Sequence, residues 1–151
     1  MSEVAEIIAE LKSIHEGEAW HGPSLKENLS GVSAAQAVAK PIPSAHSIWE
    51  LTTHIAAWEE VFLRRLEGHP TTEPEGGNFP PVGETTDATW QSRLQTLDSV
   101  HEKLLAHIST LTEDRLNEIV AGKDYTIAYL LRGIMLHHVY HSGQIALLKK
   151  L

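Results

Sequence analysis

The chain has 151 residues, of which 42% are hydrophobic, and a formal net charge of -8 from 12 Lys and Arg against 20 Asp and Glu. This length and composition are typical of one globular domain, which we expect to cover residues 1–151. No basic run is longer than Lys149–Lys150, so the sequence excludes the basic face of a nucleic-acid binder and disfavours an anionic membrane surface.

The chain contains no cysteine, which excludes disulfide bonds, cysteine-ligated zinc and a cysteine nucleophile. The acidic, amphipathic start "MSEVAEIIAELKSIHEGE" has none of the features of a signal peptide. No apolar run is long enough to span a membrane. We therefore expect a cytoplasmic protein.

Four segments have the apolar spacing of amphipathic helices. The first covers about Glu3 to Glu18, and the second begins near Ser47 and is closed by Gly68. The third covers about Asp87 to Ser109, and the fourth about Thr126 to Lys150. Ser47 followed by Glu50 is a capping-box pattern. A short helix near Ser33 to Ala39 is also expected, and since no segment alternates like a strand, the prediction is an all-α fold.

The connection at residues 68–86, "GHPTTEPEGGNFPPVGETT", is rich in Pro, Gly and Glu. Antiparallel neighbouring helices need only short loops, whereas this segment is long enough to return along a whole helix. It therefore permits the second and third long helices to run parallel. A disordered insertion would explain the same length.

Histidine is abundant, with 10 copies, and three copies define a candidate metal site. His137 and His141 are four residues apart, so they lie one turn apart on a single helix face. They continue the apolar stripe through Leu130 and Ile134, which predicts that they point inward. His54 lies at the inner edge of the second helix. Three neutral imidazoles suit zinc, nickel or another late first-row metal and leave coordination positions open.

Two alternatives stay open on this evidence. His138 could pair with His141 in place of His137, although it points about 100° away from His137. The histidines could also be core residues whose ring nitrogens are satisfied by protein acceptors. His101, on the stripe of the third helix, could be a core residue or a partner that supports a metal ligand, and the core interpretation is favoured.

The segments "HSIWELTTHIAAW" and "GIMLHHVYHSGQIALLK" resemble the DinB/YfiT-like superfamily of metal-binding helical proteins, and the likeness covers most of the chain. The most specific part is the pattern His-x-x-Tyr-His-x-Gly-Gln-Ile, whose histidines fall on His137 and His141; the family's second-helix histidine falls on His54. The resemblance implies a four-helix bundle in up-down-down-up order and a divalent metal on these three residues. Zinc and nickel are the leading candidates, followed by iron and manganese.

The resemblance also implies a small-molecule substrate, and members of the family are often dimers. Characterised relatives include transferases and an isomerase that use low-molecular-weight thiols, and others are assigned as metal-dependent hydrolases. We therefore expect an enzyme that activates a water or a thiol. The alternatives are a metal-binding or small-molecule-binding stress protein without turnover and a purely helical scaffold.

Several neighbours of the site carry weaker expectations. Gln144 is equally compatible with supporting a ligand and with a surface amide, and Gly143 is expected to permit close helix approach. Trp20 and His21 could roof the pocket, although plain packing of Trp20 and a solvated His21 are slightly favoured. Tyr140 is expected to pack with its hydroxyl at the edge.

The remaining histidines and carboxylates add no catalytic group. Glu50 and Glu59 are the nearest carboxylates to His54, but the capping role of Glu50 is the stronger interpretation, so no general acid or base is assigned. A final group of histidines is interpreted as surface or loop residues: His15, His46, His69 and His107.

Overall fold

The computed structural model describes residues 1–151 and contains no β-strand. Its elements are α1 (Glu3–Glu16), α2 (Leu25–Leu29), α3 (Ala34–Val38), α4 (Ile48–Leu66), α5 (Asp87–Ile108), the 3-10 helix η1 (Glu113–Asn117) and α6 (Ile127–Leu148). The predicted all-α class is therefore confirmed, and the four long predicted helices and the short helix before "KPIPS" are present. None of the helices combines the length and the apolar character that crossing a bilayer requires.

The start of α4 is fixed by the predicted capping box. The Ser47 hydroxyl accepts a hydrogen bond from the Glu50 amide at 3.1 Å, and the Glu50 carboxylate accepts one from the Ser47 amide at 2.7 Å. This reciprocal pair satisfies two amides that have no partner inside the helix. Beyond the other end of α4, Gly68 adopts a φ of +93°, a conformation that glycine tolerates better than other residues.

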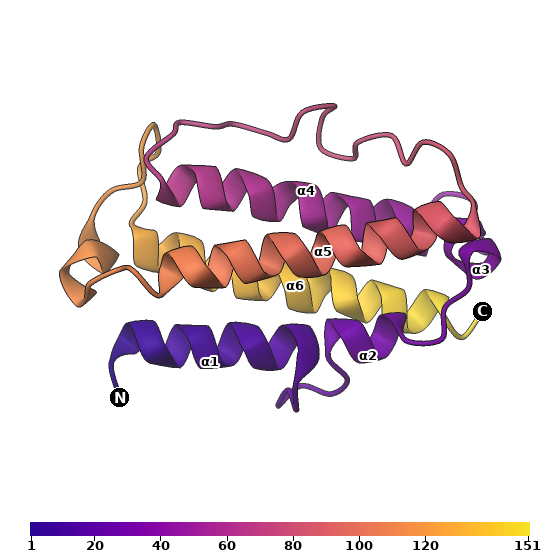
Figure 1. The fold of residues 1–151 in the computed structure, drawn as a ribbon, viewed down its shortest axis with the longest axis horizontal. Helices are drawn as coiled ribbons and strands as arrows, with labels where there is room; N and C mark the ends of the chain where they lie inside the picture. The colour runs from indigo at the N-terminus through magenta and orange to yellow at the C-terminus, as the bar shows by residue number, and fades with distance from the viewer.

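The four long helices lie side by side, with α1 against α5 and α6, and α4 against the same two helices (Figure 1). Helices α4 and α5 run in the same direction, and the chain between them returns along the outside of the helices (Figure 1). Of the two explanations for the long connection, the structure therefore shows the one in which it joins parallel helices.

Two apolar clusters form the core, one toward each end of the long helices. One contains Leu11, Leu66 and Ile134, and the other contains Leu51, Trp90 and Ile145. On α6, the turns between Met135 of the first cluster and Ile145 of the second carry the three neighbouring histidines. The middle of the fold is therefore a polar layer between two apolar ones.

Candidate metal centre

The structure brings His54 of α4 together with His137 and His141 of α6. One ring nitrogen from each residue lies within 4.8 Å of the others. The ring centroid of His54 lies 5.0 Å from that of His137 and 4.6 Å from that of His141. The centroids of the two α6 rings are 4.5 Å apart. These three side chains are within the range in which they could hold one metal ion.

Helical geometry explains which α6 histidines meet His54. His137 and His141 are separated by one turn, and His138 is rotated by about 100° from His137. His138 is fully buried and faces the interior, whereas His137 is half-buried. The structure therefore groups His137, and not His138, with His54 and His141. His138 has a buried role of its own.

Two of the three rings are oriented by acceptors outside the group. The Nδ1–H of His54 donates to the Asn78 carbonyl at 2.6 Å, and that of His141 donates to Gln144 Oε1 at 2.6 Å. Because Nδ1 carries the proton in each neutral ring, Nε2 keeps its lone pair. This is how metal-binding histidines are commonly held. Gln144 is therefore not a free surface amide, because its side chain holds the ring of His141.

His137 lacks such an acceptor. Its Nε2 lies 2.9 Å from His54 Nε2, and its Nδ1 is buried without a hydrogen-bond partner. Since His54 Nε2 bears a lone pair, the short approach requires a proton or a cation between the two nitrogens. A hydrogen bond from His137 Nε2–H to His54 Nε2 meets this requirement. Independently of this contact, three neutral imidazoles are a ligand set that suits a late first-row divalent metal.

Burial keeps the three imidazoles neutral. Desolvation lowers the pKa of His54 to about 4 and that of His137 to about 3, and neighbouring histidines add to the fall. The pKa of His141 is also lowered, again mainly by burial. The uncharged form is the one that binds a metal ion.

The three histidines line a pocket of about 560 Å³. The segment between α4 and α5 closes one side of it, because Phe79 stacks on His54 at 4.1 Å and on His46 at 3.6 Å between ring centroids. Asn78 also accepts a hydrogen bond from the Trp58 indole at 2.9 Å. The sequence analysis did not identify Asn78 and Phe79 as part of the pocket, although an aromatic residue within the "GGNFPP" stretch was an indication of it.

Several expectations about the surroundings were wrong. Trp20 is fully exposed and neither packs nor roofs the pocket, while His21 is exposed, as the favoured interpretation had it. Tyr140 is mainly exposed and lines the pocket rather than packing inside. A Cβ built on Gly143 meets no atom within 4 Å, so this glycine serves no close helix approach.

A second histidine group lies in the core: His15 of α1, His101 of α5 and His138 of α6. The interpretation of His15 as a surface residue was wrong, since it is only 2% exposed and stacks on His101 at 3.8 Å. The fully buried carboxylate of Glu59 lies beside this group, 2.7 Å from His101 and 3.1 Å from His138. Two groups of three histidines in this chain could therefore hold a metal ion.

The comparison with known proteins agrees with the histidine pattern and the helical fold. A family model described as the DinB superfamily matches residues 20–145. No curated protein and no solved structure matches the chain. Since the family model spans most of the sequence, the chain belongs to the DinB superfamily.

Proposed function

We propose that His54, His137 and His141 bind one divalent metal ion and that the pocket beside them binds a small-molecule substrate. The observation that carries this proposal is the convergence of three ring nitrogens in an open pocket, with two rings turned by hydrogen bonds to the Asn78 carbonyl and to Gln144. Three protein ligands leave a coordination position for a further molecule, which distinguishes reactive from structural sites.

Zinc and nickel are the metals we favour, because neutral imidazoles suit them. A divalent ion in this position lowers the pKa of a water or thiol that binds to it. The chain's own contribution is to orient the imidazoles, keep them neutral and shield the site. His54, for example, is covered by the ring of Phe79 from the segment between α4 and α5.

The pocket lining limits the chemistry that the protein itself supplies. Its walls are aromatic, aliphatic, imidazole and amide groups, and no carboxylate, lysine or arginine lines it. Glu50 is occupied in the capping box, and Glu59 lies in the second histidine group. Apart from the proposed ligands, the titratable groups in the lining are His46 and Tyr140, so activation of a nucleophile depends on the metal, with His46 as the candidate side-chain base. We propose hydrolysis by water or transfer to a low-molecular-weight thiol as the reaction classes.

The proposal extends to the architecture. We propose that residues 1–151 form one domain whose long helices make the up-down-down-up four-helix bundle expected from the family. The course of the chain in Figure 1 supports this order: α4 and α5 are parallel, and α1 and α6 run opposite to them.

The first test is the metal content of the purified chain, measured by elemental analysis beside His54→Gln, His137→Gln and His141→Gln. We expect each substitution to abolish binding at the pocket. His69→Gln is the matched control, because His69 is exposed and belongs to neither histidine group. Unchanged metal content in all three pocket variants would disprove the site.

The second test concerns turnover. The metal-loaded chain is assayed against ester and amide substrates, and against electrophiles with and without a low-molecular-weight thiol. Consumption of the thiol identifies a transferase, and turnover without it identifies a hydrolase. The lack of a carboxylate in the lining supports the second candidate, a binding protein without turnover. Stoichiometric metal without activity on any of these substrates would favour that candidate.

A further inference from the structure

We propose that the exposed face of α6 is the contact surface for a second copy of this chain, with the α6 helices of the two copies packed antiparallel about a two-fold axis. The family resemblance names no surface for such a contact, whereas the exposure pattern of α6 does. This inference does not rest on the function proposed for the pocket.

The outer face of α6 is apolar where the outer face of a helix is normally polar. The exposed positions of α4 carry charged side chains, Glu60 and Arg64. On α6, by contrast, no Asp, Glu, Lys or Arg occurs from Gly133 to Leu148. A helix that is apolar all round is normally buried on every side. The outer face of α6 therefore lacks the partner that its composition predicts.

Four large apolar side chains project from this face. Each is between 59% and 71% exposed, and together they define the α6 stripe: Tyr129, Leu136, Tyr140 and Leu147. Gly133 and Gly143 lie between them and add no polar side chain. Arg132 is the only charged residue at the exposed positions of α6, and it pairs with Glu3 of the same chain. No charge on α6 therefore opposes a partner at the centre of the stripe.

The stripe is large enough to anchor a stable contact. From Tyr129 to Leu147 it extends for about 27 Å along the helix. Its four side chains offer roughly 500 Å² of apolar surface, against about 800 Å² per partner in a typical protein–protein interface. The glycines and the flanks of α6 add to this area. Exposed apolar patches of several hundred Å² characteristically mark interaction sites.

The spacing of the stripe indicates an antiparallel helix as its occupant. With the two glycines included, its positions are alternately four and three residues apart, which is the spacing of a coiled-coil seam. This spacing is the same when it is read from either end. In an antiparallel pair, Tyr129 therefore lies opposite Leu147 of the partner subunit, and Leu136 lies opposite Tyr140 of the partner subunit. Each tyrosine meets a leucine.

The same symmetry favours a second copy over an unrelated partner. A two-fold contact needs one surface that is complementary to itself, and a stripe whose spacing is the same in both directions meets this condition. An unrelated protein would require no such symmetry. An anionic membrane surface is disfavoured by the net charge of -8.

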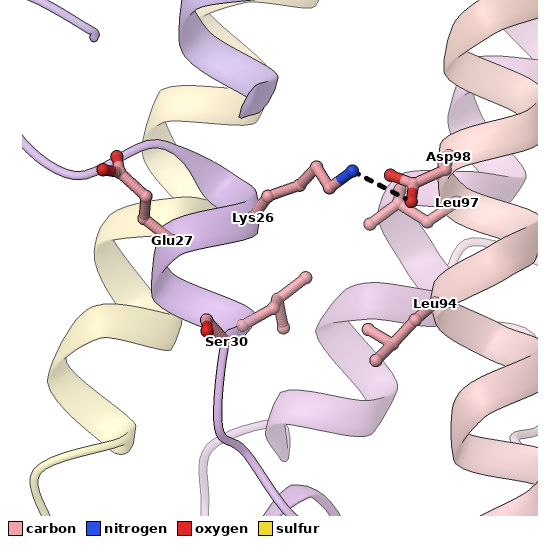
Figure 2. Close-up of a pocket in the computed structure, with 7 residues that line it drawn as sticks. Lys26, Glu27, Ser30, Leu94, Leu97 and Asp98 are labelled. Atoms are coloured by element: carbon pink, nitrogen blue, oxygen red, sulfur yellow. Dashed lines mark ion pairs between the residues drawn. The ribbon is translucent and has the colours of Figure 1, made fainter. Parts of the chain in front are cut away.

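The hollow between α2 and α5 has a different character. Figure 2 shows Lys26 reaching across it toward Asp98, and the two side chains pair at 3.2 Å. Asp98 also accepts a hydrogen bond from His15 Nε2–H at 2.9 Å. Leucines line this hollow too, but its central charges are paired within the chain. It therefore does not call for a second molecule as the α6 stripe does.

The proposed contact borders the candidate metal centre. Tyr140 belongs to the α6 stripe and also lines the pocket that contains His137 and His141. A copy seated on the stripe covers Tyr140 and so shields one edge of the pocket from water. The neighbouring chain thus becomes part of the surroundings of the site.

The first test is the molar mass of the full chain, measured by sedimentation at several concentrations. We expect a dimer for the wild type and monomers for Leu136→Arg and Leu147→Arg, which place a charge in the stripe. Trp20→Arg is the matched control, because Trp20 is fully exposed but lies outside α6, and it should remain dimeric. Circular dichroism checks that the variants keep their helices. A monomeric wild type, or a dimer that survives both stripe substitutions, would overturn the proposal.

The second test examines the antiparallel register without disturbing the dimer. The chain contains no cysteine, so an introduced cysteine reports on its own position. Tyr129→Cys and Leu147→Cys are mixed, allowed to exchange subunits and oxidised. We expect a disulfide between the two variants as the main product, and none when either variant is oxidised alone. A disulfide within Tyr129→Cys alone would show parallel helices and contradict the two-fold contact.

Discussion

At the scale of single residues, the adjacent pair His137 and His138 shows how one helix places neighbouring histidines in two different surroundings. Successive residues of a helix point about 100° apart. His137 therefore faces the pocket with His54, and His138 faces the core with Glu59. Sequence spacing alone suggested a choice between these two histidines, whereas the structure uses both in different places.

Gln144 provides the first prediction at this scale. Its Oε1 accepts the Nδ1 proton of His141 at 2.6 Å. Since loss of such an outer partner typically weakens metal binding about 10- to 100-fold, we expect Gln144→Ala to lower zinc affinity at the pocket by that range. Competition with a chromophoric chelator measures it. The exposed Gln91 provides the control, and equal affinities in Gln144→Ala and Gln91→Ala would contradict the prediction.

Glu59 and His138 provide the second prediction, for the metal-free chain. Burial by itself lowers the pKa of His138, but the charge and hydrogen bond of Glu59 raise it above its ordinary value. Removing one member of a buried ion pair leaves an uncompensated charge, so His138→Ala should cost about 3–5 kcal/mol of unfolding free energy. The double variant Glu59→Gln/His138→Ala should lose less than the sum of the single losses. Urea unfolding of the four proteins measures this coupling, and additive losses would exclude it.

The one-turn spacing of His137 and His141 was visible in the sequence, but the expectation that both continue the buried stripe was wrong for His137, because His138 is the fully buried residue and His137 is half-buried. The buried state of His15 was not visible in the sequence. Its partner Asp98 is 83 positions away, and no local pattern indicates that the two side chains meet. Glu59 was considered only as a base for His54, because periodicity does not reveal which neighbour a buried carboxylate faces.

At the scale of elements, periodicity and capping signals predicted the long helices to within about two residues at most ends. The short elements α2 and η1 were missed because five residues are too few to display a helical period; α3 has the same length and was expected only as a short helix before "KPIPS". The covering role of residues 78 and 79 was also hidden. It depends on the path of the connection across the pocket, and that path is set by tertiary packing.

Gly143 gives a prediction at this scale. It lies inside α6, and a Cβ there meets no atom within 4 Å. Because alanine is favoured over glycine in a helix interior by about 1 kcal/mol, we expect Gly143→Ala to raise the unfolding temperature without changing metal content. Calorimetry and elemental analysis measure the two quantities.

Gly122→Ala is the contrasting control. Gly122 has a φ of +70°, and a Cβ would approach Pro70 to 2.9 Å, so this variant should be less stable than the wild type. A lower unfolding temperature for Gly143→Ala would show that α6 needs the glycine for a contact outside this chain.

At the scale of the whole molecule, a layer of buried histidines separates two apolar clusters and makes stability depend on pH. Burial lowers the pKa of His15 and His54 to about 4 and that of His137 to about 3, from an ordinary value of 6.5. In the metal-free chain, unfolding therefore lets these three groups take up protons between about pH 6.5 and pH 4. His138 behaves in the opposite way, because its pKa is raised in the folded chain.

The metal-free chain should consequently be most stable near pH 6.5. Below that value the unfolded state binds more protons, so the unfolding free energy falls with pH, and His15 alone accounts for about 3 kcal/mol between pH 6.5 and pH 4. Above it the folded state keeps the His138 proton that the unfolded state has lost, so the contribution of His138 is present below pH 6.5 and disappears as pH rises through its folded pKa. Urea unfolding of the metal-free protein, in the presence of a chelator, measures the unfolding free energy from pH 4 to pH 9 and so tests both parts of the prediction. His15→Gln should reduce the loss of unfolding free energy between pH 6.5 and pH 4, and His69→Gln should leave that loss unchanged. The same loss in both variants would mean that His15 is not neutral in the folded chain.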